Sequence, residues 1–100
     1  MQLGRVPDDE LAKPRTFSQS TLDAVLAPWY AASEPFDLFR VAEVVLAVAQ
    51  GTWTERNWVR DPYSVNDFHI LARGGLVVTI RLAREYPSYV QLIRIGPLNP

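Results

Sequence analysis

A chain of 100 residues in which 48% are hydrophobic and 21% charged has the composition of one soluble globular domain rather than of a disordered segment. It contains no cysteine, which excludes disulfides, thiolate metal sites and cysteine nucleophiles. The formal net charge of −1 is not the basic balance of a general nucleic-acid binder. Residues 51–100 nevertheless carry six basic against four acidic side chains.

Residues 1–17 are expected to form an N-terminal arm, and residues 18–100 a single α+β domain. Asp8, Asp9 and Glu10 stand near the start, which argues against a leader peptide. The longest apolar stretch, residues 41–49, is far shorter than the ~20 residues that a bilayer span needs. We therefore expect no membrane partner and a cytoplasmic location.

A first helix is predicted to start at Ser20, the expected N-cap, with Asp23 three residues later. Its apolar stripe has helical spacing and comprises Leu22, Val25, Leu26 and Trp29. Pro28 removes a backbone donor and clashes with the preceding turn, so the helix is expected to end near Ala27 or to kink there.

A second helix is predicted over residues 36–50, after the start signal Ser33-Glu34-Pro35 and before Gly51, a good left-handed C-cap. Apolar residues go nearly all the way round it, and Phe39, Val44 and Leu46 fall outside the main stripe. Such a helix is usually buried on more than one side. Two explanations remain open: the sheet and the first helix wrap it, or part of it faces another chain as a homo-oligomer contact.

The segment from Gly51 to Ser64 has no clear secondary-structure period and concentrates large aromatic and charged side chains. Tryptophan, tyrosine and arginine are the residues that most often anchor protein interfaces. The expected partner-binding residues are Trp53, Arg56, Trp58, Arg60 and Tyr63. The alternative is that the aromatics plug the edge of a small core.

Three strands are predicted after this segment, over residues 67–73, 76–83 and 89–95. A three-residue loop Arg73-Gly74-Gly75 separates polar from apolar residues best. It places one apolar set on a single face: Phe68, Ile70, Ala72, Leu76, Val78, Ile80 and Leu82.

The inward face of the third strand stays ambiguous, because Val90 with Leu92 and Ile93 with Ile95 are equally good candidates. The expected fold is α+β, with two helices packed on one face of a three-stranded antiparallel β-meander.

The polar face of this sheet is a second candidate surface. His69, Arg73 and Arg81 share it, Arg84 lies just beyond it, and Tyr86 stands in the adjoining turn. They could bind phosphates or stacked bases, meet a protein partner, or simply face solvent. His69 is the only histidine, and with Asp67 two residues away it could form a His–Asp pair that a serine nucleophile completes.

The order of two helices and then three antiparallel strands, with arginines on the sheet, resembles the later part of RelE/ParE-type toxins. The resemblance implies action on RNA or nucleic-acid machinery through the basic face. The chain departs from these toxins in having no recognisable strand before its helices and none of the family's motifs, so no functional residue is carried over.

No glycine-rich phosphate loop, nucleophile elbow or metal-ligand spacing occurs, and no catalytic residue, metal or cofactor is expected. The leading hypothesis is therefore a small non-catalytic protein-binding module. An inhibitor, an immunity protein or a phage-type accessory protein that blocks a site on a partner protein would fit. The toxin-like action on RNA is the alternative.

Overall fold

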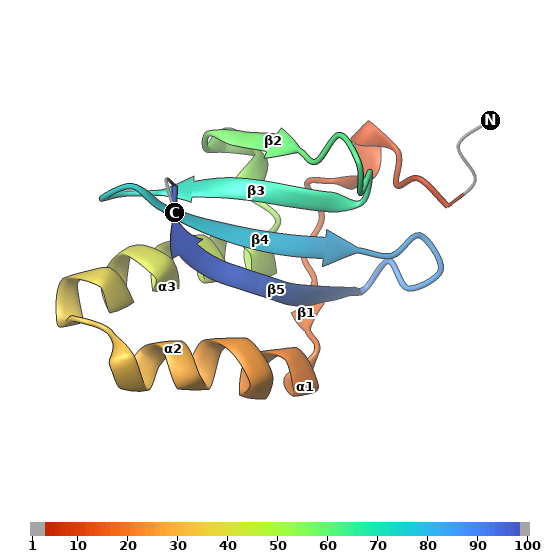
Figure 1. Cartoon of the computed structure of the whole chain (residues 1–100). Helices are drawn as coiled ribbons and strands as arrows, with labels where there is room; N and C mark the ends of the chain where they lie inside the picture. The colour runs from red at the N-terminus through yellow and green to blue at the C-terminus, as the bar shows by residue number, and fades with distance from the viewer. Residues whose placement is uncertain (1–3, 99–100) are drawn as a thin grey trace.

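The computed structural model describes residues 4–98, which form one five-stranded sheet with helices on one side of it (Figure 1). The strands are β1 (Thr16–Phe17), β2 (Trp58–Arg60), β3 (Asp67–Ala72), β4 (Leu76–Leu82) and β5 (Tyr89–Pro97). Their order across the sheet is β1-β5-β4-β3-β2. Strand β1 runs parallel to β5, and the other neighbours are antiparallel.

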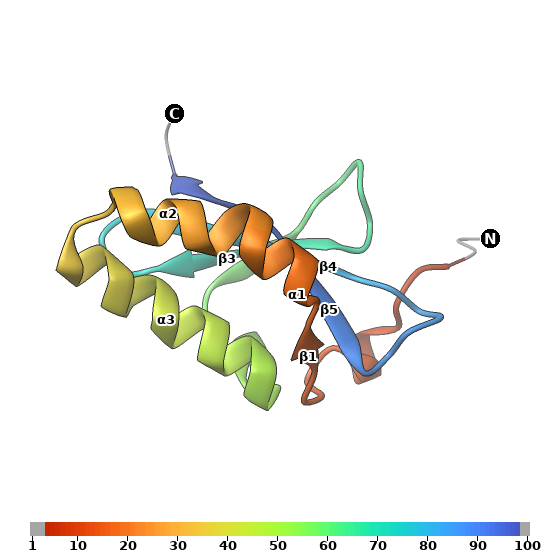
Figure 2. The same cartoon turned by 90° about the horizontal axis from the view of Figure 1, so that it is seen from below.

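The predicted three-stranded antiparallel meander with two helices is wrong. The sheet is mixed and has two further strands, both short and both at its edges. Of the two expected helices, only α3 (Pro35–Gln50) is an uninterrupted α-helix. In Figure 1, α3 lies behind the sheet, and in the view from below the first helical segment runs beside it (Figure 2).

The first helical segment combines α1 (Gln19–Thr21), a π-helical stretch over Leu22–Leu26, and α2 (Ala27–Ala32). It begins before Ser20, with Ser18 as its N-cap. It also passes through Pro28, where an end or a kink was expected. The N–H of Ala27 donates to the carbonyl of Leu22, five residues back. This wider turn offers a way to place a proline inside a helix, where an ordinary turn would clash with its ring.

Helix α3 confirms the second predicted helix to within one residue at its start. Pro35 occupies the first turn, and Gly51 caps the end in the left-handed conformation, with φ of 80°. Its inner side buries Val41, Val44 and Val48 completely against β3 and β4. The sheet therefore covers one side of this apolar helix and leaves the other uncovered.

The β3–β4 hairpin has the predicted register. Ala72 pairs with Leu76, which leaves Arg73, Gly74 and Gly75 as a three-residue loop. Phe68 pairs with Ile80, and both are fully buried in the core, whereas Leu76 beside the loop is partly buried and packs against it.

A β-bulge resolves the ambiguous face of β5. Thr79 pairs with Arg94 but the next residue, Ile80, pairs with Leu92, so Ile93 is the extra residue. A bulge reverses the in-and-out alternation beyond it. Val90 and Leu92 are thus buried before the bulge, and Ile95 packs against the core after it. The set Val90 and Leu92 was therefore right, and of the set Ile93 and Ile95 only Ile95 packs against the core.

Two residues of the N-terminal segment, Val6 and Leu11, belong to the core cluster. Val6 and Leu11 are 1% and 2% exposed. Arg15 is also buried, and its guanidinium donates to the carbonyls of Leu11 at 3.0 Å and Glu10 at 2.7 Å. Burial lowers the pKa of Arg15. The division into an arm of residues 1–17 and a domain of residues 18–100 stays a prediction.

Candidate functional site

Trp53 lies at the centre of the core and offers no surface to a partner. Its side chain is fully buried, and its Nε1 donates to the carbonyl of Leu11 at 3.1 Å. Its ring packs edge-on against Trp58 and Phe68, each at 5.2 Å between centroids. This residue of the aromatic segment is therefore part of the core.

Trp58 and Arg60 extend the same packing along β2. Trp58 is half-buried and donates from Nε1 to the carbonyl of Thr54 at 3.1 Å. The Arg60 guanidinium lies over the ring of Phe68, 4.6 Å from its centroid, and donates to the carbonyl of Val65 at 2.6 Å. Burial, with the nearby positive charge of Arg5, lowers the pKa of Arg60. Both side chains are held by the fold.

The remaining two residues of the predicted partner-binding set lie further out. Arg56 forms an ion pair with Glu43 of α3 at 3.9 Å. Tyr63 is 96% exposed in the loop between β2 and β3. Of the five residues, Tyr63 alone presents a freely exposed aromatic ring.

Acidic side chains neutralise much of the predicted basic face. Arg81 donates to Asp67 from Nε at 2.7 Å and from Nη2 at 3.0 Å, and this hydrogen bonding raises the pKa of Arg81. Arg73 pairs with Glu43. Asp67 is therefore the partner of Arg81 and not, as considered from the sequence, of His69.

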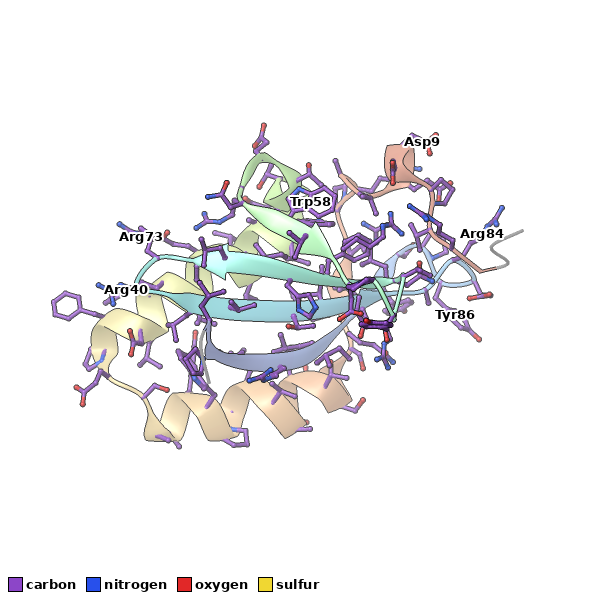
Figure 3. All side chains as sticks on the ribbon, turned by 45° about the horizontal axis from the view of Figure 1, so that its top comes forward. Asp9, Arg40, Trp58, Arg73, Arg84 and Tyr86 are labelled. Carbon is purple, nitrogen blue, oxygen red and sulfur yellow. The ribbon has the colours of Figure 1, made fainter. Side chains whose placement is uncertain are left out.

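The predicted basic residues also do not form one cluster. Arg73 stands beside Arg40 at the end of the β3–β4 hairpin, whereas Arg84 and Tyr86 extend from the β4–β5 loop at the far end of the sheet (Figure 3). The positive charge that nucleic acid could contact on this sheet is accordingly divided and partly cancelled.

His69 links two neighbouring elements on the sheet face that α3 does not cover, which we call the open face. Its Nε2 is 2.8 Å from Oδ2 of Asp61, and its Nδ1 is 2.9 Å from the hydroxyl of Thr79. A carboxylate only accepts hydrogen bonds, so Nε2 carries the proton. In the neutral ring, Nδ1 then accepts from Thr79.

The Thr79–His69–Asp61 chain has the residue types of a nucleophile, base and orienting acid. Thr79 is only 6% exposed, which restricts the access of a substrate carbonyl to its hydroxyl. Among residues 4–98, no group of three or more histidine or acidic side chains is placed to hold a metal ion. The arrangement fits a structural clasp between β3, β4 and the loop that follows β2.

The hydrogen bonds of Asp61 in this clasp predict that acid lowers the free energy of unfolding. The hydrogen bond from His69, then those from the backbone N–H groups of Tyr63 and Ser64, lower the pKa of Asp61 below its ordinary 3.8. A carboxyl with a depressed folded pKa stabilises the fold above its unfolded pKa, and this contribution is lost as pH falls through the folded pKa. NMR titration of the Asp61 carboxyl should give a midpoint below 3.8, and Asp61→Asn should flatten the unfolding free energy against pH in that acid range. A midpoint at or above 3.8 would contradict the clasp.

The uncovered side of α3 carries a stripe that includes Phe39 and Leu46, two of the residues that the sequence placed outside the main apolar stripe of this helix. Phe36, Phe39 and Leu46 are 75%, 70% and 56% exposed. With Glu43 and Gln50 they recur at intervals of three and four residues, the spacing of a helix seam that contacts another helix. We call these five residues the outer stripe.

Charges flank the outer stripe and cancel its central acid. Glu43 forms ion pairs with Arg73 and Arg56, and Arg40 pairs with Asp37 at 3.1 Å. These five side chains leave a net charge of +1 beside the stripe. The stripe thus has three large apolar residues, and the charge of Glu43 at its centre is compensated by ion pairs.

Comparison with protein-family models, with curated proteins and with solved structures gives no match for this chain. The resemblance to RelE/ParE-type toxins therefore rests on element order alone. The strand that seemed to be missing before the helices is present as β1, but it has only two residues. Among residues 4–98, no helix is long and apolar enough to cross a membrane.

Proposed function

We propose that this chain is a small non-catalytic protein-binding module whose contact surface is the outer stripe of α3. The observation that carries the proposal is the exposure of Phe36, Phe39 and Leu46 on one side of a well-formed helix. Single exposed apolar residues are ordinary, but large ones gathered on one surface mark interaction sites.

The energetics favour a contact at the stripe. Fully burying one phenylalanine or leucine side chain is worth roughly 1.5–3 kcal/mol. Phe36 and Phe39, which are three residues apart on the helix, are neighbours and can enter the same partner surface. Their side chains are held on a rigid helix, so ordering them costs less than ordering a loop.

The chemistry of the stripe supports an amphipathic helix as the partner. Apolar residues at the spacing of a helix seam fit the apolar side of an amphipathic helix. The net positive charge beside the stripe favours a partner helix with acidic residues at its flanks. A second copy of this chain can supply such an apolar helix through its own α3, which gives the homo-oligomer considered from the sequence. Any other protein with this kind of helix fits equally.

A module of this kind would act by covering a site on its partner, as an inhibitor, an immunity protein or a phage-type accessory protein does. The proposal needs no bound cofactor and no reacting group. The nucleic-acid alternative gains no support from the site, because Arg73 and Arg81 are engaged by Glu43 and Asp67.

Photo-crosslinking tests where the partner sits. A benzophenone side chain replaces Phe39 in one preparation and Tyr63 in another, since both positions are exposed aromatics. Each preparation is irradiated alone at high concentration and in an extract of the source cells. We expect adducts from position 39 that map by mass spectrometry to an amphipathic helix. Adducts from position 63 alone, or RNA as the only adduct, would contradict the proposal.

A further inference from the structure

The open face contains two adjoining hollows of about 260 Å³ and 400 Å³ that share four lining residues. The shared residues are Val59, His69, Val77 and Leu98. Gly96 borders the first hollow, and in β5 it stands beside Val77 of β4. Since glycine has no side chain, the sheet surface is lower at this point. The hollows together are of the size of pockets that hold small molecules.

Among the described residues that line the first hollow, Arg94 alone carries a permanent charge. It lies in a row of cross-strand neighbours that runs Val59, His69, Thr79 and Arg94 from β2 to β5. Its guanidinium lies against Gly96, with Nε and Nη2 3.4 Å from the point that a Cβ there would occupy. The Arg94 side chain thus lies along the sheet, with its guanidinium beside the hollow.

Within residues 4–98, no hydrogen bond or ion pair joins Arg94 to another residue. The other polar groups of the hollow are engaged, because Thr79 bonds to His69 and His69 bonds to Asp61. A guanidinium offers five N–H donors in a planar fork that matches a carboxylate.

We propose that this hollow binds a small carboxylate with an apolar body. The carboxylate pairs with Arg94, and the body lies against Val59, Val77 and Leu98. Val59 and Leu98 are 61% and 56% exposed, so binding would remove apolar area of both the ligand and the sheet from water. The site is separate from the outer stripe and independent of it.

Phenylacetate is a suitable probe, because it joins an aromatic ring to one carboxylate. Titration into the ¹⁵N-labelled chain should shift the amide signals of Val59, Val77 and Gly96 and saturate. Acetate lacks the apolar body and 2-phenylethanol lacks the charge. Each should bind at least about tenfold more weakly than phenylacetate, which corresponds to about 1.4 kcal/mol.

Two variants test the charge of the site and the space of the hollow separately. Arg94→Gln removes the charge from an exposed side chain and should weaken phenylacetate binding at least about tenfold. Gly96→Val keeps the charge, fills the hollow from a strand position and should weaken binding to a similar extent. Arg84→Gln, a change at an exposed arginine in the β4–β5 loop, is the control and should leave binding unchanged. Shifts that scatter over the molecule, equal binding of acetate, or unaltered binding by Arg94→Gln would overturn the proposal.

Discussion

Replacing Trp53 with alanine should lower the free energy of unfolding by about 3–5 kcal/mol, the usual cost of removing a buried tryptophan. The side chain is fully buried, and the smaller residue would leave a cavity beside Trp58 and Phe68. The carbonyl of Leu11 would also lose the hydrogen bond that Nε1 donates. Urea unfolding followed by circular dichroism measures the change.

Tyr63→Ala is the matched control, because Tyr63 comes from the same segment but is 96% exposed. Its effect should stay within about 0.5 kcal/mol, as for other surface substitutions. A loss of less than about 1 kcal/mol in Trp53→Ala would show that the tryptophan is not the centre of the core.

A second large loss is expected from Gly51→Ala. Gly51 has φ of 80°, and a Cβ there would stand 2.6 Å from the backbone carbon of Lys13 and 2.8 Å from the nitrogen of Pro14. The left-handed conformation alone costs a non-glycine residue about 1–2 kcal/mol. The clash adds a further cost of about 1–3 kcal/mol, because the N-terminal segment must move away from the end of α3.

Gly75→Ala separates these two effects. Gly75 has nearly the same φ, 77°, but a Cβ there would meet no atom within 4 Å. It should therefore show the conformational cost alone, and thermal or urea unfolding should place Gly51→Ala at least about 1 kcal/mol below it. Equal losses would mean that residues 13 and 14 do not pack against Gly51 as the structure has them.

The parts of the fold that sequence patterns predicted are those fixed by local signals. Pro35 and Gly51 mark the two ends of α3, because one suits a first helical turn and the other a left-handed cap. The β3–β4 register follows from strict alternation on both sides of a glycine loop, where a slip by one residue would expose the core.

The two edge strands lack such signals. Strand β1 has two residues and exists through its pairing with β5, more than 70 positions later in the chain. Strand β2 reads Trp58-Val59-Arg60, and it places a tryptophan and an arginine on the inner side and the valine on the outer side. Polarity alone would place the valine on the inner side and the arginine on the outer side. The arginine is inward because its guanidinium covers Phe68.

The candidate surfaces depended on tertiary packing in the same way. The composition of α3 showed that it is apolar nearly all round, but only the position of the sheet decides that Val44 is buried while Phe39 and Leu46 are exposed. Conversely, Trp53 and Trp58 look like interface anchors by residue type, and their positions beside Phe68 make them part of the core. Residue type indicated which side chains form large apolar contacts. The fold decided whether each of them lies in the core or on the surface.

The dissociation constant of the partner captured through position 39 tests the central claim most directly. It is measured for the unaltered chain, for Phe39→Glu and for Tyr63→Glu, after thermal unfolding shows that all three are folded. We predict that Phe39→Glu raises the dissociation constant at least about tenfold, as loss of an interface anchor does, and that Tyr63→Glu leaves it within about twofold. Equal affinity of Phe39→Glu and the unaltered chain would contradict a contact surface on the outer stripe.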